Sequence, residues 1–370
     1  MIITRVGILF GGRSGEHEVS IRSAESVLKA IDRSKYLPIP VAIRKDGSIA
    51  SEKQTVDMLS SELKSLLESD IQSSVASTGS DESAIVVSTL GLTTSHTDRP
   101  GKRFDVIFPV LHGPNGEDGT IQGLLELMDI PYVGSGVLGS STGMDKEIMK
   151  RILLSHGLPL LPFVSFKKHE WDRDQEKIIH NIESETGYPA FVKPANMGSS
   201  VGITKAHSRD ELLKGIELAL SYDRKVVVEK GINAREIEIA ILGNDLPEAS
   251  VAGEVIPCNE FYDYEAKYLV DNSELIIPAA ITPSEHDLIK NYAIKAFVSL
   301  DCAGFARADF FIDKDSGKIY FNELNTIPGF TSKSLYPRLW EASGLAYGDL
   351  IHRLIELAFE RHREKGDSFN

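Results

Sequence analysis

The chain has 370 residues, of which 42% are hydrophobic, so it can bury more than one core and we expect two or three domains. Forty basic and 54 acidic residues give a formal charge of -14, which argues against non-specific binding to nucleic acid or to an anionic membrane surface. Two cysteines without metal-ligand spacing favour a reducing compartment. Since no apolar run has the roughly 18 residues of a membrane span, we expect a cytoplasmic protein with neither a membrane nor a nucleic-acid partner.

The N-terminal segment predicts a strand, a glycine turn and a helix. An apolar run over 6–10 is typical of a buried parallel strand, and the glycines at 11–15 lead into a helical pattern over 21–31. Such a turn commonly binds phosphate, but this one matches neither the dinucleotide fingerprint nor the P-loop. Glu16 at the helix entrance would repel phosphate and hold an ammonium group. Capping of the helix by the same side chain is the alternative.

A second crevice residue follows the next buried strand. Residues 38–50 predict a strand and a turn, and 51–103 form a Ser- and Thr-rich insertion that we expect to be partly mobile and without chemistry. The strand over 104–111 ends at His112 in a glycine-rich segment with two acids. Ligands of open α/β sheets collect at the carboxyl ends of strands, so His112 and the 11–12 turn should face one crevice. A loop-bracing hydrogen bond is the alternative for this histidine.

The middle of the chain predicts a phosphate-binding hairpin. After a helix over 144–154 and a polar helix over about 170–186, residues 188–203 read as strand, Gly/Ser turn and strand. The turn offers backbone N–H groups and the hydroxyls of Ser199 and Ser200 to a phosphate, with Lys193 on the strand beneath. Strands over 225–230 and 235–243 follow. The aromatic and charged segment 261–268 suggests a mobile loop that closes over a ligand, with simple packing as the alternative.

A hairpin over 304–325 carries the strongest metal-site signal. Its two alternating strands flank a cluster of turn formers at 313–318. With the turn centred on residue 316, the expected pairs are Arg307 opposite Asn325, Asp309 opposite Glu323 and Phe311 opposite Phe321. Two facing carboxylates and an amide oxygen suit Mg²⁺ or Mn²⁺ held jointly with a phosphate chain. A solvated hairpin face is the alternative.

Taken together, these segments resemble the D-alanine-D-alanine ligase family of the ATP-grasp superfamily over nearly the whole chain. The motifs are GGRSGEHEVS at 11–20, LHGPNGEDG at 111–119, MDK at 144–146, VKPANMGSSVG at 192–202, EKG at 229–231, FYDYEAKY at 261–268, ARAD at 306–309 and NELNTIPGFTSKSL at 322–335. The resemblance implies an α/β (α+β ATP-grasp) fold, in which an open parallel α/β domain precedes two α+β domains that clasp ATP between antiparallel sheets. The expected boundaries are 1–140 for the substrate-binding domain, 141–231 for the central subdomain and 232–370 for the C-terminal subdomain.

The activity implied by the resemblance is ligation of two D-alanine molecules to D-alanyl-D-alanine for peptidoglycan precursor synthesis, with ATP and two Mg²⁺ (or Mn²⁺) ions. The first carboxylate would attack the γ-phosphate to give an acyl phosphate, which the amine of the second D-alanine then attacks. The alternatives are a D-alanine-D-lactate ligase, another ATP-grasp carboxylate-amine ligase and, from a different class, a non-catalytic nucleotide-binding regulatory protein. Relatives are usually dimers, so a homodimer is expected.

The resemblance also assigns roles to individual residues. The catalytic set would be Glu16, Ser199, Tyr268, Arg307, Gly329 and Ser334, in which the first three form a hydrogen-bonded trio. The ATP-binding set would be Lys146, Lys193, Ser200, Glu229, Lys230, Ile232, Glu236, Phe261, Lys267, Phe311 and Asn322. The substrate set would be Glu16, His112, Arg307, Ser334 and Leu335, and the metal ligands would be Asp309, Glu323 and Asn325. Tyr268 would mark a dipeptide ligase, because lactate-using relatives replace it.

Overall fold

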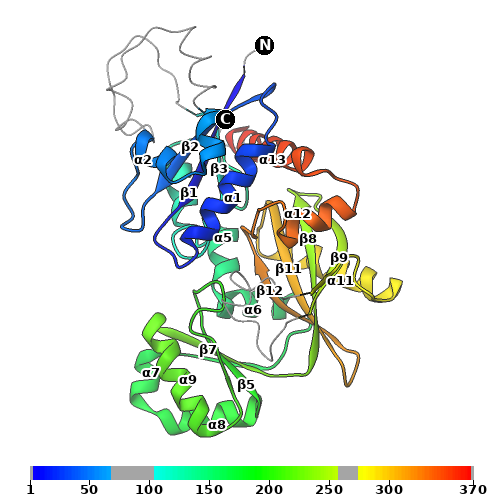
Figure 1. Cartoon of the computed structure of the whole chain (residues 1–370). Coiled ribbons are helices and arrows are strands. Elements are labelled where there is room, and N and C mark those ends of the chain that lie inside the picture. The colour runs from blue at the N-terminus through cyan, green and yellow to red at the C-terminus, as the bar shows by residue number, and fades with distance from the viewer. Residues whose placement is uncertain (1–2, 68–103, 257–273, 368–370) are drawn as a thin grey trace.

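The computed structural model describes residues 3–67, 104–256 and 274–367. Its strands form three sheets, with the orders β2-β1-β3, β4-β7-β5-β6 and β10-β9-β8-β11-β12. The first sheet is parallel and the strand pairs of the other two are antiparallel. The five-stranded sheet lies between the other two (Figure 1), which agrees with the expected parallel domain followed by two antiparallel ones. The predicted boundaries at 140 and 231 stay predictions.

The N-terminal sheet positions the glycine turn. Its elements are β1 (Thr4–Gly11), α1 (His17–Ala30), β2 (Tyr36–Ile43), α2 (Glu52–Asp57), β3 (Val106–Pro109), α4 (Thr120–Leu127) and α5 (Val137–Met144). Val6, Ile8 and Phe10 on β1 are fully buried in a core that includes residues of α1. Gly11 has φ +91°, and a Cβ there would lie 2.2 Å from the carbonyl oxygen of Ile43. Glycine is therefore required where the strand turns toward α1.

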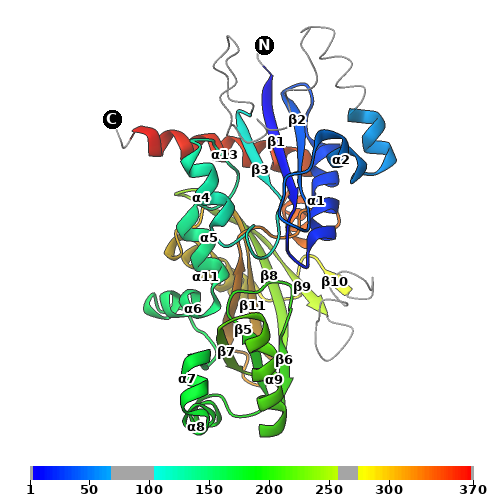
Figure 2. The same cartoon turned by 90° about the vertical axis from the view of Figure 1, so that its left-hand side faces the viewer.

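The last helices of the chain complete the core of this first sheet. They are α12 (Leu335–Ala342) and α13 (Tyr347–Asp367), and Figure 2 shows α13 beside the N-terminal strands. Leu350 and Leu354 of α13 are buried in the same cluster as Phe108 of β3. The Phe108 and Phe330 rings lie 5.5 Å apart between their centroids. Residues just before α12 are thereby held against the N-terminal domain.

The central sheet has its own core. It contains β4 (Phe163–Lys167), β5 (Ala190–Pro194), β6 (Thr204–Ala206) and β7 (Lys225–Lys230), with helices α7 (Lys168–Arg173), α8 (Gln175–Glu185) and α9 (Arg209–Tyr222). Val192, Val226 and Val228 pack with the buried residues of α8 and α9. The prediction of one helix over 170–186 is wrong, because Asp174 leaves the helical conformation and its side chain accepts a hydrogen bond from the Lys177 N–H, which starts α8.

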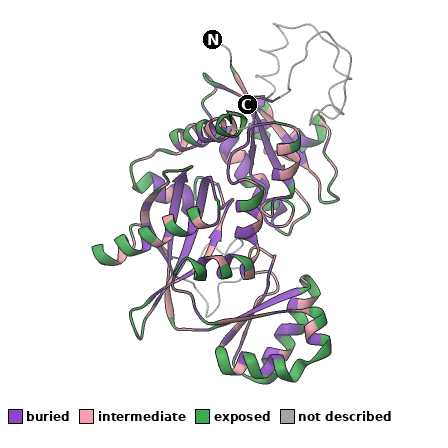
Figure 3. Cartoon of the chain, turned by 180° about the vertical axis from the view of Figure 1, so that it is seen from behind, coloured by how far each residue is buried: buried purple, intermediate pink, exposed green. Residues whose placement is uncertain are grey.

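The five-stranded sheet shares a core with a helix that precedes the central sheet. Its elements are β8 (Ala234–Gly243), β9 (Glu248–Ile256), β10 (Glu274–Ile276), α11 (Pro283–Ser299), β11 (Gly304–Asp313) and β12 (Ile319–Asn325). Met149 and Leu153 of α6 (Lys146–Ser155) are buried with Phe297 of α11 and Phe310 of β11. In Figure 3 buried residues line the strands while the outer sides of the helices are exposed.

The β11–β12 register confirms two of the three predicted pairs. Arg307 lies opposite Asn325 and Asp309 opposite Glu323, but a register shift follows Asp309. Phe310, not Phe311, therefore lies opposite Phe321, and the prediction for Phe311 is wrong. The shift leaves Asn322 as the extra residue of β12, which is a β-bulge. As a result Phe310 and Phe321 both stay in the core, with their rings edge to face and their centroids 5.3 Å apart.

Two predicted features lie outside the described residues. These are most of the insertion, at 68–103, and the whole of the 261–268 loop. The described start of the insertion contains α2. Leu59 and Leu63, which follow this helix, are buried in the N-terminal core. Across the described ranges, no helix is long and apolar enough to cross a membrane.

Candidate active site

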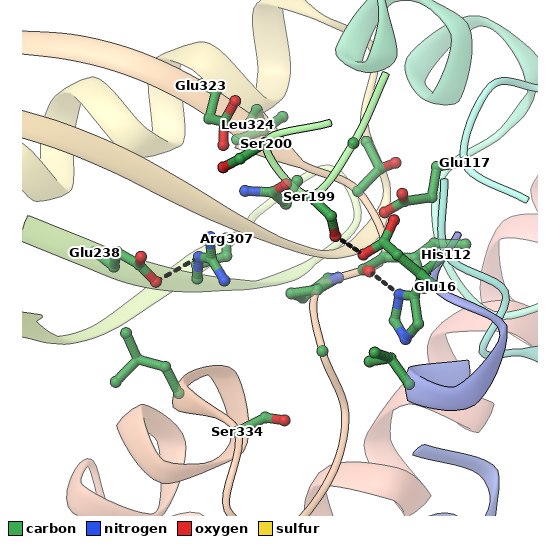
Figure 4. A pocket seen from close by; sticks show the side chains of 18 of the residues that line it. Glu16, His112, Glu117, Ser199, Ser200, Glu238, Arg307, Glu323, Leu324 and Ser334 are labelled. Carbon is green, nitrogen blue, oxygen red and sulfur yellow. Dashed lines mark hydrogen bonds and ion pairs between the residues drawn. The ribbon is translucent and has the colours of Figure 1, made fainter. Parts of the chain in front are cut away.

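A cavity of about 610 Å³ opens where the three sheets approach one another, and Figure 4 shows its lining. Side chains reach it from the N-terminal domain, the Gly/Ser hairpin and the five-stranded sheet. The predicted site residues that line it are Glu16, His112, Lys146, Ser199, Ser200, Arg307, Glu323, Asn325, Gly329, Ser334 and Leu335. Predicted site residues that lie far apart in the sequence therefore line the same cavity.

Glu16 connects the N-terminal domain to the hairpin. It occupies the N-cap position of α1, but its side chain makes no capping hydrogen bond. Instead, its buried carboxylate accepts a hydrogen bond from the Ser199 hydroxyl (Figure 4). The capping interpretation is therefore wrong, and two members of the predicted trio are in contact. Tyr268, the third member, lies outside the described residues.

Glu117 is a neighbour of Glu16 that sequence reasoning missed. The backbone N–H of Gly113 donates to its carboxylate at 2.6 Å. Burial, and next the charge of Glu16, raise the pKa of Glu117 well above its usual range. The glycine-rich segment after β3 showed two acids, but only the fold places one of them beside Glu16. This end of the cavity is acidic and suits an ammonium group.

His112 holds the loop that follows β12. Its Nδ1 lies 3.0 Å from the carbonyl oxygen of Ile327, and its Nε2 lies 3.2 Å from the hydroxyl of Ser23. That hydroxyl also accepts from the backbone N–H of Phe330 at 3.4 Å. Burial lowers the pKa of His112. The loop-bracing interpretation is correct, and the braced loop includes Gly329, which also lines the cavity.

Arg307 lies across the cavity, between two carboxylates. Its Nε and Nη2 each lie 2.7 Å from an oxygen of Asp309, and its Nε lies 2.6 Å from the carboxylate of Glu238. Burial alone would lower the pKa of Arg307, but Asp309 and Glu238 raise it well above its usual range. Glu238 was not predicted, because only the β8–β11 pairing places it opposite Asp309. The guanidinium is thus fixed in orientation and permanently charged.

The predicted metal ligands meet on this face of the sheet. Asp309 lies opposite Glu323, and the side-chain amide of Asn325 lies 3.1 Å from an oxygen of Asp309. No group of three His, Cys, Asp or Glu side chains suited to a metal ion occurs within the described residues. Two carboxylates and an amide nevertheless match the oxygen ligands that Mg²⁺ accepts when phosphates and water complete its coordination. The residues therefore fit the ion.

The predicted nucleotide residues are spread over the cavity wall, the end of β7 and the β8–β11 pair. Lys146 donates to the carbonyl oxygen of Met197 in the hairpin at 2.7 Å. Glu236 and Phe311 lie opposite each other on β8 and β11. Lys230 and Ile232 stand at the end of β7, where the Lys230 N–H donates to the carbonyl oxygen of Pro162 at 3.0 Å. Phe261 and Lys267 lie outside the described residues.

Two ion clusters join α6 to β7. In the Lys225 cluster, the ammonium of Lys225 lies 2.6 Å from Asp145 and 2.8 Å from Glu147. In the Glu229 cluster, the carboxylate of Glu229 lies 3.0 Å from the ammonium of Lys193 and 3.2 Å from that of Lys150. Lys150 was not predicted as a site residue. Its position on a helix, four residues after Lys146, does not indicate that it packs against Glu229 of β7.

Comparison with known proteins decides the family. The family model described as D-ala D-ala ligase N-terminus matches residues 5–135, and the one described as D-ala D-ala ligase C-terminus matches 152–356. A D-alanine--D-alanine ligase of Natranaerobius thermophilus is 50% identical over 362 residues, which cover 98% of this chain and 96% of that protein. The chain belongs to the D-alanine-D-alanine ligase family. A member from Geobacillus thermodenitrificans is 49% identical, with 98% of this chain and 97% of that protein covered.

Two solved ligase structures share the fold of this chain. The D-alanine-D-alanine ligase of Coxiella burnetii has a TM-score of 0.79 and 32% identity, and the match covers 99% of this chain and 97% of that one. The VanG D-Ala:D-Ser ligase of Enterococcus faecalis has a TM-score of 0.78 and 34% identity, with 96% and 100% covered. The resemblance and the ATP-grasp fold class predicted from the sequence are therefore confirmed.

Proposed function

We propose that this chain joins two D-alanine molecules to D-alanyl-D-alanine, with ATP converted to ADP and phosphate. The observation that carries the proposal is that Glu16 and Arg307 line one cavity. An acid for an ammonium group and a fixed guanidinium for a developing negative charge stand at its two sides. A regulatory nucleotide-binding protein would need neither.

The acidic end of the cavity would orient the first D-alanine. Glu16 would hold its ammonium group, so that its carboxylate points toward the phosphates and attacks the γ-phosphate to form an acyl phosphate. The amine of the second D-alanine then attacks the acyl carbon, and phosphate leaves. Arg307 and the backbone N–H of Gly329 would stabilise the oxyanion of this step, where one such donor commonly contributes about 3 to 4 kcal/mol. Ser334 and Leu335 would hold the second carboxylate.

The phosphate chain would be held by lysines and by the hairpin. Lys146, Lys193 and the N–H groups around Ser200 supply positive charge and donors. Asp309, Glu323 and Asn325 would hold two Mg²⁺ or Mn²⁺ ions, which neutralise phosphate charge. We therefore expect a Glu323→Gln variant to fold, to lose Mn²⁺ binding by electron paramagnetic resonance and to lose turnover. Normal Mn²⁺ binding and turnover in that variant would remove the metal assignment.

A coupled assay for ADP release tests the reaction. D-alanine should stimulate ADP release, L-alanine should not, and chromatography should show the dipeptide. Stimulation by L-alanine alone, or release of ADP without a ligated product, would contradict the proposal. A role in peptidoglycan precursor synthesis, a cytoplasmic location and a homodimer are further parts of the proposal, and size-exclusion chromatography with light scattering checks the last.

Competition between acceptors tests the product. We propose that D-alanine outcompetes D-lactate at pH 7, because Tyr268 stands where the resemblance places the tyrosine of dipeptide ligases. D-lactate should gain as the pH falls, since more of the attacking amine of D-alanine is then protonated. Equal amounts of D-alanine, D-lactate and D-serine would be incubated with the enzyme and ATP. Predominance of an ester or of a serine-containing product would assign a different acceptor.

A further inference from the structure

We propose that Lys150 is a positioning residue for ATP: it holds the carboxylate of Glu229, so that Lys193 can leave that carboxylate and bind the nucleotide phosphates. The inference rests on the proposed function, because it takes Lys193 as a phosphate ligand. Lys150 itself contacts no substrate in this scheme. Its effect on ATP binding is exerted through Glu229.

Lys150 is a charged side chain built into the interior. Its side chain is 1% exposed, and that of Glu229 is 3% exposed. The Lys150 ammonium lies 3.2 Å from Glu229, donates to the carbonyl oxygen of Asn322 at 3.4 Å and lies 5.8 Å from the centroid of the Phe163 ring. A buried ammonium persists only with such partners, because removal from water disfavours its charged form. The lysine is thus fixed in one place by three different elements.

Glu229 is shared between two cations of unequal freedom. One oxygen faces Lys150, and the other accepts from Lys193 at 3.0 Å. Lys193 has a 10% exposed side chain and sits on β5, directly before the hairpin that carries Ser199 and Ser200. Lys150 is enclosed in the interior, whereas Lys193 is slightly more exposed and stands on the strand that leads into the predicted phosphate-binding hairpin. The cluster holds two positive charges and one negative charge, so one ammonium is in excess.

This excess allows an exchange of partners. If Lys193 turned toward a phosphate with no other cation present, it would leave a buried carboxylate unpaired, which is strongly unfavourable. With Lys150 in place, Glu229 keeps an ion pair throughout. Binding of ATP by Lys193 then does not need to overcome the full electrostatic loss at Glu229. Lys150 should therefore raise affinity for ATP without touching it.

The contact with Asn322 holds the Lys150 ammonium in place. Asn322 is the bulged residue of β12 and immediately precedes the predicted metal ligand Glu323. The Lys150 ammonium thus contacts both the end of β7, near the predicted adenine site, and β12, which carries predicted metal ligands. This second contact keeps the ammonium beside Glu229 while Lys193 binds the nucleotide.

The test is a double-mutant cycle on ATP affinity, measured by calorimetry with ATP and MgCl₂ in the absence of D-alanine. We expect Lys150→Met to weaken ATP binding roughly tenfold or more, because Lys193 becomes the sole partner of Glu229. Glu229→Gln in the Lys150→Met background should restore most of the affinity, since the amide needs no cation. The KM for D-alanine at saturating ATP should stay the same. Lys225→Met, the matched control, should leave ATP affinity within about twofold.

Two outcomes would overturn the inference. Wild-type ATP affinity in Lys150→Met would do so, and so would simple additivity of the two substitutions, which a purely structural role predicts. If Lys150→Met does not fold, Glu229→Gln and the double variant are compared instead. They should bind ATP equally, because Lys150 is dispensable once Glu229 is neutral, and a clear loss in the double variant would contradict this. Normal ATP binding by Lys193→Met would remove the assignment of Lys193 to the phosphates, whereas failure of the wild type to bind ATP would refute the proposed function.

Discussion

The Lys225 and Glu229 clusters each contain three charged groups, but with carboxylates and ammonium groups in opposite proportion. Both join α6 to β7, and Lys225 and Glu229 lie on the same face of that strand, since side chains of one face recur every second residue. In the Lys225 cluster one ammonium serves two carboxylates. In the Glu229 cluster one carboxylate serves two ammonium groups. Within these clusters, one end of β7 has more carboxylates than ammonium groups, and the other end has more ammonium groups than carboxylates.

The difference is explained by what surrounds each cluster. The extra acceptors near Lys225 are satisfied within the protein: Asp145 accepts from the N–H groups of Glu147 and Ile148, while Glu147 accepts from Ser165 and pairs with the exposed Arg151 at 2.8 Å. This is a helix N-cap reinforced by an ion pair. The extra cation near Glu229 belongs to Lys193, next to the hairpin. We infer that the first cluster stabilises the joint between α6 and the central sheet, whereas the second also serves an anionic ligand.

The largest effect should come from removing the cation in excess. Lys193→Met should lower kcat/KM for ATP by about 10³-fold, because it deletes charge at the phosphates, while Lys225→Met should change it by less than about threefold. Steady-state kinetics with ADP detection makes the measurement. Similar losses in both variants would remove the functional distinction between the clusters.

Stability should respond in the opposite order. Lys225→Met leaves Asp145 without its cation and Glu147 with only the exposed guanidinium of Arg151, so the free energy of unfolding should fall by about 3 kcal/mol. Lys193→Met should cost less, since Glu229 keeps Lys150. Urea unfolding followed by circular dichroism gives both values. A larger loss in Lys193→Met would show that the Glu229 cluster is the main structural joint.

Acid should weaken the Lys225 cluster. Burial would raise the pKa of Asp145, but the hydrogen bonds from Lys225, Ile148 and Asn196 outweigh it and lower that pKa. An acid with a lowered pKa stabilises the fold above its ordinary pKa of about 3.9, and this contribution is lost as the pH falls through the lowered value. Asp145→Asn should therefore flatten the pH dependence of the urea midpoint between about pH 5 and pH 3. An unchanged slope would exclude Asp145 as a contributor.

The smallest effect is expected at the edge of the Lys225 cluster. The hydroxyl of Ser165 donates to Glu147 at 3.0 Å. Ser165→Ala should lower the free energy of unfolding by about 1 kcal/mol, the net contribution of one such hydrogen bond. ATP affinity should not change. Calorimetric unfolding together with ATP titration checks both, and altered ATP affinity would mean that the two clusters are not independent.

Local patterns predicted the elements around the site, and the family resemblance predicted which residues would gather. The pairing of Asp309 with Glu323 follows from alternation and a turn, and it holds in the structure. The bulge at Asn322 could not be read from the sequence, because it depends on keeping Phe310 and Phe321 together in the core. Glu238 and Lys150 were missed for a related reason. Each is defined by a partner on a neighbouring element, and a single sequence does not show which elements pack together.

The packing of the last helices on the first sheet determines the order in which the chain can fold during synthesis. Leu350 and Leu354 belong to the N-terminal core, so that domain lacks part of its interior until α13 has emerged from the ribosome. The central core, in contrast, lies wholly within residues 164–228. Limited proteolysis of stalled nascent chains tests this order. Protection of the N-terminal sheet in chains that stop before α13 would contradict it. The central domain can thus fold before the core of the N-terminal domain is complete.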